Sequence, residues 1–140
     1  MLSRETDLVR LRAEILSTVD YSLMGFDEKF QNKTIRPIIK LQRDLLIAVF
    51  KNYTLKHKCV FDFLCVEKKM AYVENAIQKD IKFRNSLKGM IIGQFTLEEY
   101  DLYIKNSSAL NKRMMNIVIE NIKNNMQLFD VEHSDLLIKK

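Results

Sequence analysis

Apolar residues recur at intervals of three and four along most of this chain, with charged and amide residues between them. This spacing places the apolar side chains on one face of an α-helix. The residues that break helices most strongly are few: Gly25, Gly89, Gly93 and Pro37. Two long stretches, 38–88 and 94–140, contain neither glycine nor proline, which favours long helices. The pattern therefore predicts an all-α fold.

The first helix is expected over residues 3–20. Ser3 is a good N-cap, and Glu5 and Asp7 stand in the first turn, where the helix dipole favours carboxylates. Its apolar face is predicted to comprise Leu8, Leu11, Ile15, Leu16 and Val19. Residues 21–34 contain a glycine, several aromatic residues and a polar cluster. They are expected to form a connection that packs back onto the core.

A second helix is expected over residues 36–52, with Pro37 in its first turn, where the missing N–H is not needed. The predicted inner face comprises Ile38, Leu41, Leu45, Ala48, Val49 and Tyr53. The apolar phase weakens between residues 51 and 58, so we expect a turn there. The alternative is one unbroken helix over 38–88, about 75 Å long, which could bury its faces only against other chains.

A third helix is expected over residues 58–88. Its first part, 59–66, is apolar on nearly every side, so periodicity leaves both a buried strand and a helix open. The helical phase is then clear through Phe63, Val66, Met70, Val73, Ile77, Ile81 and Leu87. Gly89 and Gly93 flank three apolar residues, which predicts a short loop whose side chains fill the core.

A fourth helix is expected over residues 96–129. Thr96 and Glu99 have the spacing of a capping box, the strongest local signal in the chain. The apolar face comprises Tyr100, Tyr103, Leu110, Met114, Ile117, Val118, Ile122, Met126 and Phe129. Residues 106–108 are Asn-Ser-Ser, whose side chains compete for backbone hydrogen bonds and should kink or interrupt the helix. Residues 130–140 are expected to form either a flexible tail or a short docked element.

These elements predict one helical domain over residues 1–140, an irregular or up-down bundle of four helices of which the last two are long. Long helices beside shorter ones would leave an apolar stripe uncovered. Such a stripe would bind a partner, either a second copy of the chain or another protein.

Composition narrows the class of protein. Apolar residues make up 47% of the chain, too many for an intrinsically disordered segment. No apolar run approaches the length needed to span a bilayer, and residues 1–16 lack the apolar block of a signal peptide. We therefore expect a cytoplasmic protein that does not insert into membranes.

Catalytic chemistry has little support in the sequence. Phosphate-binding glycine loops, dinucleotide fingerprints and the common hydrolase and metalloprotease motifs are absent, which predicts a protein that is not an enzyme and needs no cofactor. Cys59 and Cys65, with His57 nearby, lack the spacing of a zinc site and are interpreted as two buried thiols. Glu98, Glu99 and Asp101 are interpreted as support for a helix start.

The net charge of +5 is concentrated around the second helix. On a helical wheel Arg36, Lys40, Arg43 and Lys51 share one side, opposite apolar residues. Three interpretations compete: a solvated surface, a site for an acidic protein or membrane surface, and a site for the phosphate backbone of a nucleic acid. The absence of tryptophan disfavours the membrane surface.

Met114, Met115 and Met126 suggest an adaptable apolar partner surface, although methionine is also an ordinary core residue and the core is favoured. The leading hypothesis is a non-enzymatic helical protein-interaction module, such as an adaptor, a chaperone-like binder or a small subunit of a larger assembly. The alternative is a nucleic-acid- or ribosome-associated factor that binds phosphates through the basic side of the second helix.

Overall fold

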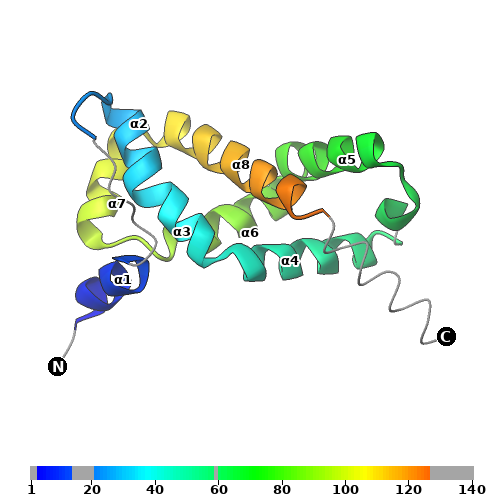
Figure 1. Cartoon of the computed structure of the whole chain (residues 1–140), viewed down its shortest axis with the longest axis horizontal. Coiled ribbons are helices and arrows are strands. Elements are labelled where there is room, and N and C mark those ends of the chain that lie inside the picture. The colour runs from blue at the N-terminus through cyan, green and yellow to red at the C-terminus, as the bar shows by residue number, and fades with distance from the viewer. Residues whose placement is uncertain (1–2, 14–20, 59, 127–140) are drawn as a thin grey trace.

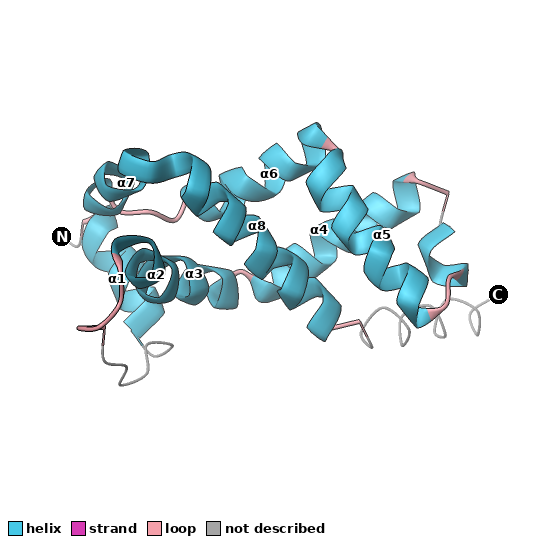
Figure 2. Cartoon of the chain, turned by 90° about the horizontal axis from the view of Figure 1, so that it is seen from above, coloured by secondary structure: helices cyan, strands magenta, loops and turns pink. Residues whose placement is uncertain are grey.

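The computed structural model describes residues 3–13, 21–58 and 60–126. Every regular element in these residues is a helix, so the all-α prediction is confirmed. The helices form an elongated, irregular bundle in which α8, Ser107–Asn124, runs through the middle (Figures 1 and 2). This helix contacts α3, α4, α5 and α6, whose bounds follow, and most of its apolar residues are fully buried. The core is therefore built around α8.

The N-terminal part contains one short helix and one long helical run. Helix α1 covers Arg4–Ala13, and the backbone N–H of Thr6 donates to the Ser3 hydroxyl as the predicted N-cap requires. The long run is made of α2 (Phe26–Phe30), a π-helical turn η1 (Gln31–Ile35) and α3 (Arg36–Leu41). The rest of the predicted first helix, 14–20, and the predicted tail, 130–140, lie outside the described residues.

Residues 21–34 were expected to form a connection, and from Phe26 onward this expectation is wrong. The helical run that contains Pro37 already begins at Phe26. The backbone N–H of Arg36 donates to the carbonyl of Gln31, five residues back, which is a π-helical hydrogen bond. A proline inside an α-helix clashes with the carbonyl four residues earlier. The wider π turn immediately before Pro37 gives the ring room, so the helix continues through it.

After a bend at Gln42, helix α4 covers Arg43–Lys56 and ends in a turn where Lys58 has a φ of 63°. The break predicted between 51 and 58 therefore occurs, but at the end of that range. The bend also changes which side chains face inward. Leu41 and Leu45, predicted to be buried, are exposed, and Leu46, Ile47 and Phe50 are buried in their place.

The predicted third helix, 58–88, is divided into three elements: a 3-10 turn η2 (Val60–Phe63), α5 (Val66–Lys79) and α6 (Ile81–Ile92). The division between α5 and α6 is caused by Asp80, whose backbone is extended and whose carboxylate accepts from the N–H of Phe83 as an N-cap. Asp80 also accepts a hydrogen bond from the Tyr53 hydroxyl at 2.9 Å. In the described part of 59–66, the open choice between strand and helix is resolved as the 3-10 turn.

The loop expected between Gly89 and Gly93 is also wrong, because α6 continues to Ile92. Of the three apolar residues between these glycines, the middle one, Ile91, is fully buried, as expected for a side chain that fills the core. The last predicted helix is correct in its start and in its interruption: α7 covers Leu97–Tyr103, a 3-10 turn η3 covers Ile104–Asn106, and α8 follows.

Candidate functional site

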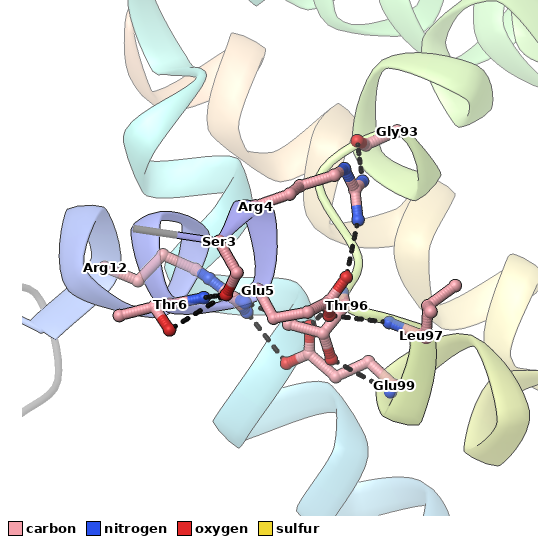
Figure 3. A network of polar contacts seen from close by, with 9 residues as sticks. All are labelled: Ser3, Arg4, Glu5, Thr6, Arg12, Gly93, Thr96, Leu97 and Glu99. Carbon is pink, nitrogen blue, oxygen red and sulfur yellow. Dashed lines mark hydrogen bonds and ion pairs between the residues drawn. The ribbon is translucent and has the colours of Figure 1, made fainter. Parts of the chain in front are cut away.

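Helix α1 attaches to the protein at the junction between α6 and α7 (Figure 3). Arg4 Nη2 donates to the carbonyl oxygen of Gly93, just after α6, at 2.9 Å. Glu5 Oε2 accepts from the backbone N–H of Leu97, the first residue of α7, at 2.9 Å. A cation at a helix C-terminus and an anion at an N-terminus both complement the helix dipole. Helix α1 thus binds the two helix ends through charge.

A buried ion pair completes this attachment. Arg12 donates two hydrogen bonds to the two carboxylate oxygens of Glu99, both at 2.9 Å, and the side chains are 5% and 17% exposed. Glu99 also accepts from the Thr34 hydroxyl at 3.1 Å and from the backbone N–H of Thr96, so the predicted capping box is confirmed. One carboxylate therefore joins α1, η1 and α7.

The electrostatics of Glu99 follow from these contacts. Burial by itself would raise the pKa of this carboxyl group. The hydrogen bonds from Arg12, Thr96 and Thr34 and the charge of Arg12 outweigh burial and hold the pKa of Glu99 below its ordinary value of 4.5. The carboxylate is therefore charged at neutral pH and holds α7 in a fixed orientation.

With Glu99 turned inward, the opposite face of α7 carries large apolar side chains in solvent. Leu97 and Tyr100 of α7 are 71% and 45% exposed, and Ile104, the first residue of the adjoining turn η3, is 54% exposed. Their spacing of three and four residues places them within about 60° of one another on a helical wheel. We call these three residues the α7 apolar face. Exposed apolar residues grouped in this way indicate a binding surface more often than single ones do.

A pocket adjoins this face. It has a volume of about 450 Å³, and its lining residues are Arg4, Glu5, Ile92, Phe95, Thr96, Leu97 and Tyr100. The apolar side chains come from α6, α7 and the segment between them, while Arg4 and Glu5 of α1 add two charged groups. The α7 apolar face and the pocket together offer an apolar surface with a recess that can receive a large side chain.

Charged residues run along one side of the α7 apolar face. Glu98 and Asp101 are exposed, and the pKa-shifted Glu99 is not among them because it faces inward. Lys105 is exposed at the far end of the same side. A partner that covers the α7 apolar face would therefore lie beside the carboxylates of Glu98 and Asp101.

The predicted basic side of the second helix is divided by the bend at Gln42. Arg36 and Lys40 are exposed one turn apart on α3. Arg43 and Lys51 belong to α4, where Arg43 pairs with Asp44 at 3.2 Å and Lys51 is half-buried. The structure thus brings Arg36 and Lys40 together and separates them from the other two cations.

Arg36 and Lys40 line a groove between α3 and α8 with a volume of about 270 Å³, and its other lining residues are Ile39, Ile117, Glu120, Asn121 and Asn124. The side-chain Nδ2 of Asn121 is buried and has no hydrogen-bond partner, the one such side-chain atom in the described part of the chain. An unpaired buried donor costs about 1 to 3 kcal/mol. We call this set of residues the α3–α8 groove.

The methionines proposed as an apolar partner surface are core residues. Met114, Met115 and Met126 are 0%, 1% and 7% exposed, so they offer no surface to a partner. Met114 and Met115 belong to α8 and Met126 follows it, and all three are buried, as the core interpretation expects. Cys65 is a free thiol, but the interpretation of it as buried is wrong, because the residue is exposed. Cys59 lies outside the described residues.

Comparison of the chain with protein-family models, with curated protein sequences and with solved structures gives no match. Within residues 3–13, 21–58 and 60–126, no helix is both long and apolar enough to cross a membrane. In the same residues, no group of three or more His, Cys, Asp and Glu side chains is arranged to hold a metal ion.

Sequence reasoning missed the most buried contact of the site. The predicted inner face of α1 included Leu11, which is 55% exposed, whereas Arg12 is 4% exposed and faces inward. An apolar pattern cannot identify an arginine as the buried residue. The capping box of Thr96 and Glu99 is the one local signal at this site, and it does not identify Arg12 as the partner of Glu99.

Proposed function

We propose that this chain is a non-enzymatic helical interaction module that binds a partner protein through the α7 apolar face. The observation that carries the proposal is that Leu97 and Tyr100 of α7 and Ile104 at the start of η3 are exposed on one side. The ion pair of Glu99 with Arg12 holds α7 in place. A rigid, preformed surface loses little conformational freedom on binding, which favours affinity.

The partner best suited to this surface is an amphipathic helix with a basic flank. Its apolar residues would cover Leu97, Tyr100 and Ile104, with one large side chain in the adjoining pocket of about 450 Å³. Lysine or arginine residues beside its apolar stripe would approach Glu98 and Asp101. Complementary charge of this kind contributes mainly to the association rate and to specificity.

The test compares capture of partners by two double variants of the full chain. Leu97→Ser with Ile104→Ser removes the α7 apolar face. Leu55→Ser with Ile81→Ser is the matched control, since these residues are 53% and 70% exposed but lie on α4 and α6. Circular dichroism should show the same helix content for both.

The expected result is that proteins captured by the wild type are retained by the control and lost by the α7 variant, as measured by quantitative mass spectrometry. Light scattering then distinguishes a second copy of the chain from a different protein. Equal capture by both variants would contradict the proposal, and so would a wild-type monomer that captures nothing.

The alternative, a nucleic-acid-binding factor, has narrower support. Only Arg36 and Lys40 remain adjacent of the four cations, and Glu120 faces the same groove. Two phosphate contacts would give weak binding that falls as salt rises. Binding of nonspecific RNA that disappears as salt rises, and that Arg36→Glu with Lys40→Glu abolishes, would favour this alternative.

A further inference from the structure

Within the described residues, the α3–α8 groove combines charged groups that have no ion-pair partner with a buried amide nitrogen that has no acceptor. Arg36 and Lys40 project from α3, and Glu120, Asn121 and Asn124 project from α8. Within the described residues, neither cation has a carboxylate within ion-pairing distance, although Glu120 lines the same groove. Opposite charges are thus held apart across a space of about 270 Å³.

The two walls of the groove are each a single helix face. Arg36, Ile39 and Lys40 have the spacing of adjacent residues on α3, and Ile117, Glu120, Asn121 and Asn124 have it on α8. The two helices are in contact and lie side by side in Figure 1. Ile39 and Ile117, both buried, give the groove an apolar floor between its polar rims.

Arg36 is positioned to bind an anion. Its Nε donates to the Oδ1 of Asn32 at 3.0 Å, which fixes the guanidinium group, and its two terminal nitrogens have no acceptor among residues 3–13, 21–58 and 60–126. Lys40 lies one turn along, about 6 Å further on the same face. A phosphate dianion can accept hydrogen bonds from both side chains at once, and the fork of arginine suits phosphate oxygens.

The opposite wall sets the rest of the ligand. A bare phosphate would be repelled by Glu120, whereas a ligand hydroxyl could donate to that carboxylate. Asn121 lines the same wall, and its buried Nδ2 lacks a hydrogen-bond partner within the described residues. We propose that the α3–α8 groove binds a small phosphate monoester that carries hydroxyl groups, with the phosphate on Arg36 and Lys40 and a hydroxyl on Glu120.

The test is calorimetric titration of the full chain with glycerol 3-phosphate at constant ionic strength. Inorganic phosphate, glycerol and acetate serve as the other probes. The expected result is saturable binding of glycerol 3-phosphate with a Kd near or below about 1 mM, weaker binding of inorganic phosphate, and none of glycerol or acetate. Absence of saturable binding would overturn the proposal. Equal binding of the ester and of inorganic phosphate would also overturn it, because Glu120 would then have no role.

Variants locate the site. Arg36→Gln and Lys40→Gln should each weaken glycerol 3-phosphate binding by about tenfold or more, because each removes a charge-assisted contact. Arg43→Gln changes the net charge equally but lies outside the groove, and it should leave the affinity unchanged. An equal loss in all three variants would indicate general attraction to positive charge and would contradict the proposal.

Asn121→Leu distinguishes a binding role for this residue from a purely structural one, because it should change stability and ligand affinity in opposite directions. Replacing the unpaired amide with an apolar group of similar shape should raise the unfolding temperature of the free protein and weaken glycerol 3-phosphate binding. If the variant gains stability but binds as tightly as the wild type, Asn121 is not part of the site. If it does not fold, the two exposed α3 variants still decide the question.

Discussion

Arg12 places a positive charge inside the protein, and a single carboxylate neutralises it. Its two hydrogen bonds to Glu99 are each 2.9 Å long, and its Nε also donates to the carbonyl of Leu8 within α1. This geometry satisfies most of the donors of the guanidinium group. A buried charge that is well paired is stable, but removal of one partner leaves the other desolvated and unpaired.

We therefore expect Arg12→Met to reduce the free energy of unfolding by about 3 kcal/mol. The double variant Arg12→Met with Glu99→Gln should be less destabilised than the sum of the single changes, because it leaves no unpaired charge. A double-mutant cycle from urea unfolding curves measures the difference. Strict additivity of the two single changes would show that the two residues are not coupled.

The same ion pair predicts a dependence of stability on pH. The pKa of Glu99 is lower in the folded protein than its ordinary value of 4.5, so the unfolded chain binds this proton more readily. The contribution of Glu99 is complete above pH 4.5 and is lost as the pH falls through the lowered folded value. Urea unfolding between neutral and acid pH should show a steeper loss for the wild type than for Glu99→Gln. Parallel curves for the two proteins would contradict this assignment.

Some residue roles were predictable, and others were not. The capping box of Thr96 and Glu99 is local, so its spacing in the sequence was enough. The contacts of Arg12 and Thr34 with Glu99 join residues more than sixty positions apart, and no local pattern encodes them. The same holds for Asn121, whose buried amide is defined by the approach of α3 to α8.

At the scale of the elements, a helix ends where a side chain can accept hydrogen bonds from backbone N–H groups of the next helix, as an N-cap does. Asp80 separates α5 from α6 although apolar residues keep a helical period across it. Its carboxylate caps α6 through Phe83 N–H and accepts from Tyr53, and these two hydrogen bonds hold the pKa of Asp80 below its ordinary value. Apolar periodicity alone could not reveal this break, because the pattern continues on both sides.

We expect Asp80→Ala to lower the free energy of unfolding, because the N-cap hydrogen bond to the N–H of Phe83 is lost. Asp80→Asn is the matched control, since its amide oxygen can still accept from Phe83 N–H. Thermal unfolding followed by circular dichroism should place Asp80→Asn close to the wild type and Asp80→Ala below it. An alanine variant as stable as the wild type would show that the cap does not determine the break.

The element boundaries of the first half were predicted least well, and the reason is physical. Pro37 was interpreted as a helix start because proline is common there. The π turn before it allows the helix to pass through, so 26–41 is one helical run. The bend at Gln42 then rotates α4 relative to α3, which exposes Leu41 and Leu45 and divides the basic residues between two helices.

At the scale of the whole molecule, the predicted fold class was correct because long apolar periodicity is a strong signal. The arrangement around a central α8 was not predictable, since it depends on which faces meet. The predicted overhang of a long third helix does not occur. Exposed apolar residues are found on η2, α5 and α6, which divide that helix, and also on α7, at the end of the molecule where α1 attaches (Figure 1).

The α7 apolar face and the α3–α8 groove have no lining residue in common, which predicts that they act independently. Leu97→Ser with Ile104→Ser should bind glycerol 3-phosphate as tightly as the wild type. Arg36→Gln should capture the same partner proteins as the wild type. Loss of both activities in either variant, with helix content unchanged, would show that the two surfaces belong to one site.

The π turn also restricts how the chain can change during evolution. Lys33 is exposed, and an exposed helix position ordinarily tolerates deletion better than a buried one. Deletion of Lys33 would convert the π turn into an α turn, press the ring of Pro37 against a backbone carbonyl, and rotate Thr34 away from Glu99. Homologues that retain this proline should therefore retain the same number of residues between it and the preceding threonine. That spacing offers a sequence signature for relatives whose overall similarity has been lost.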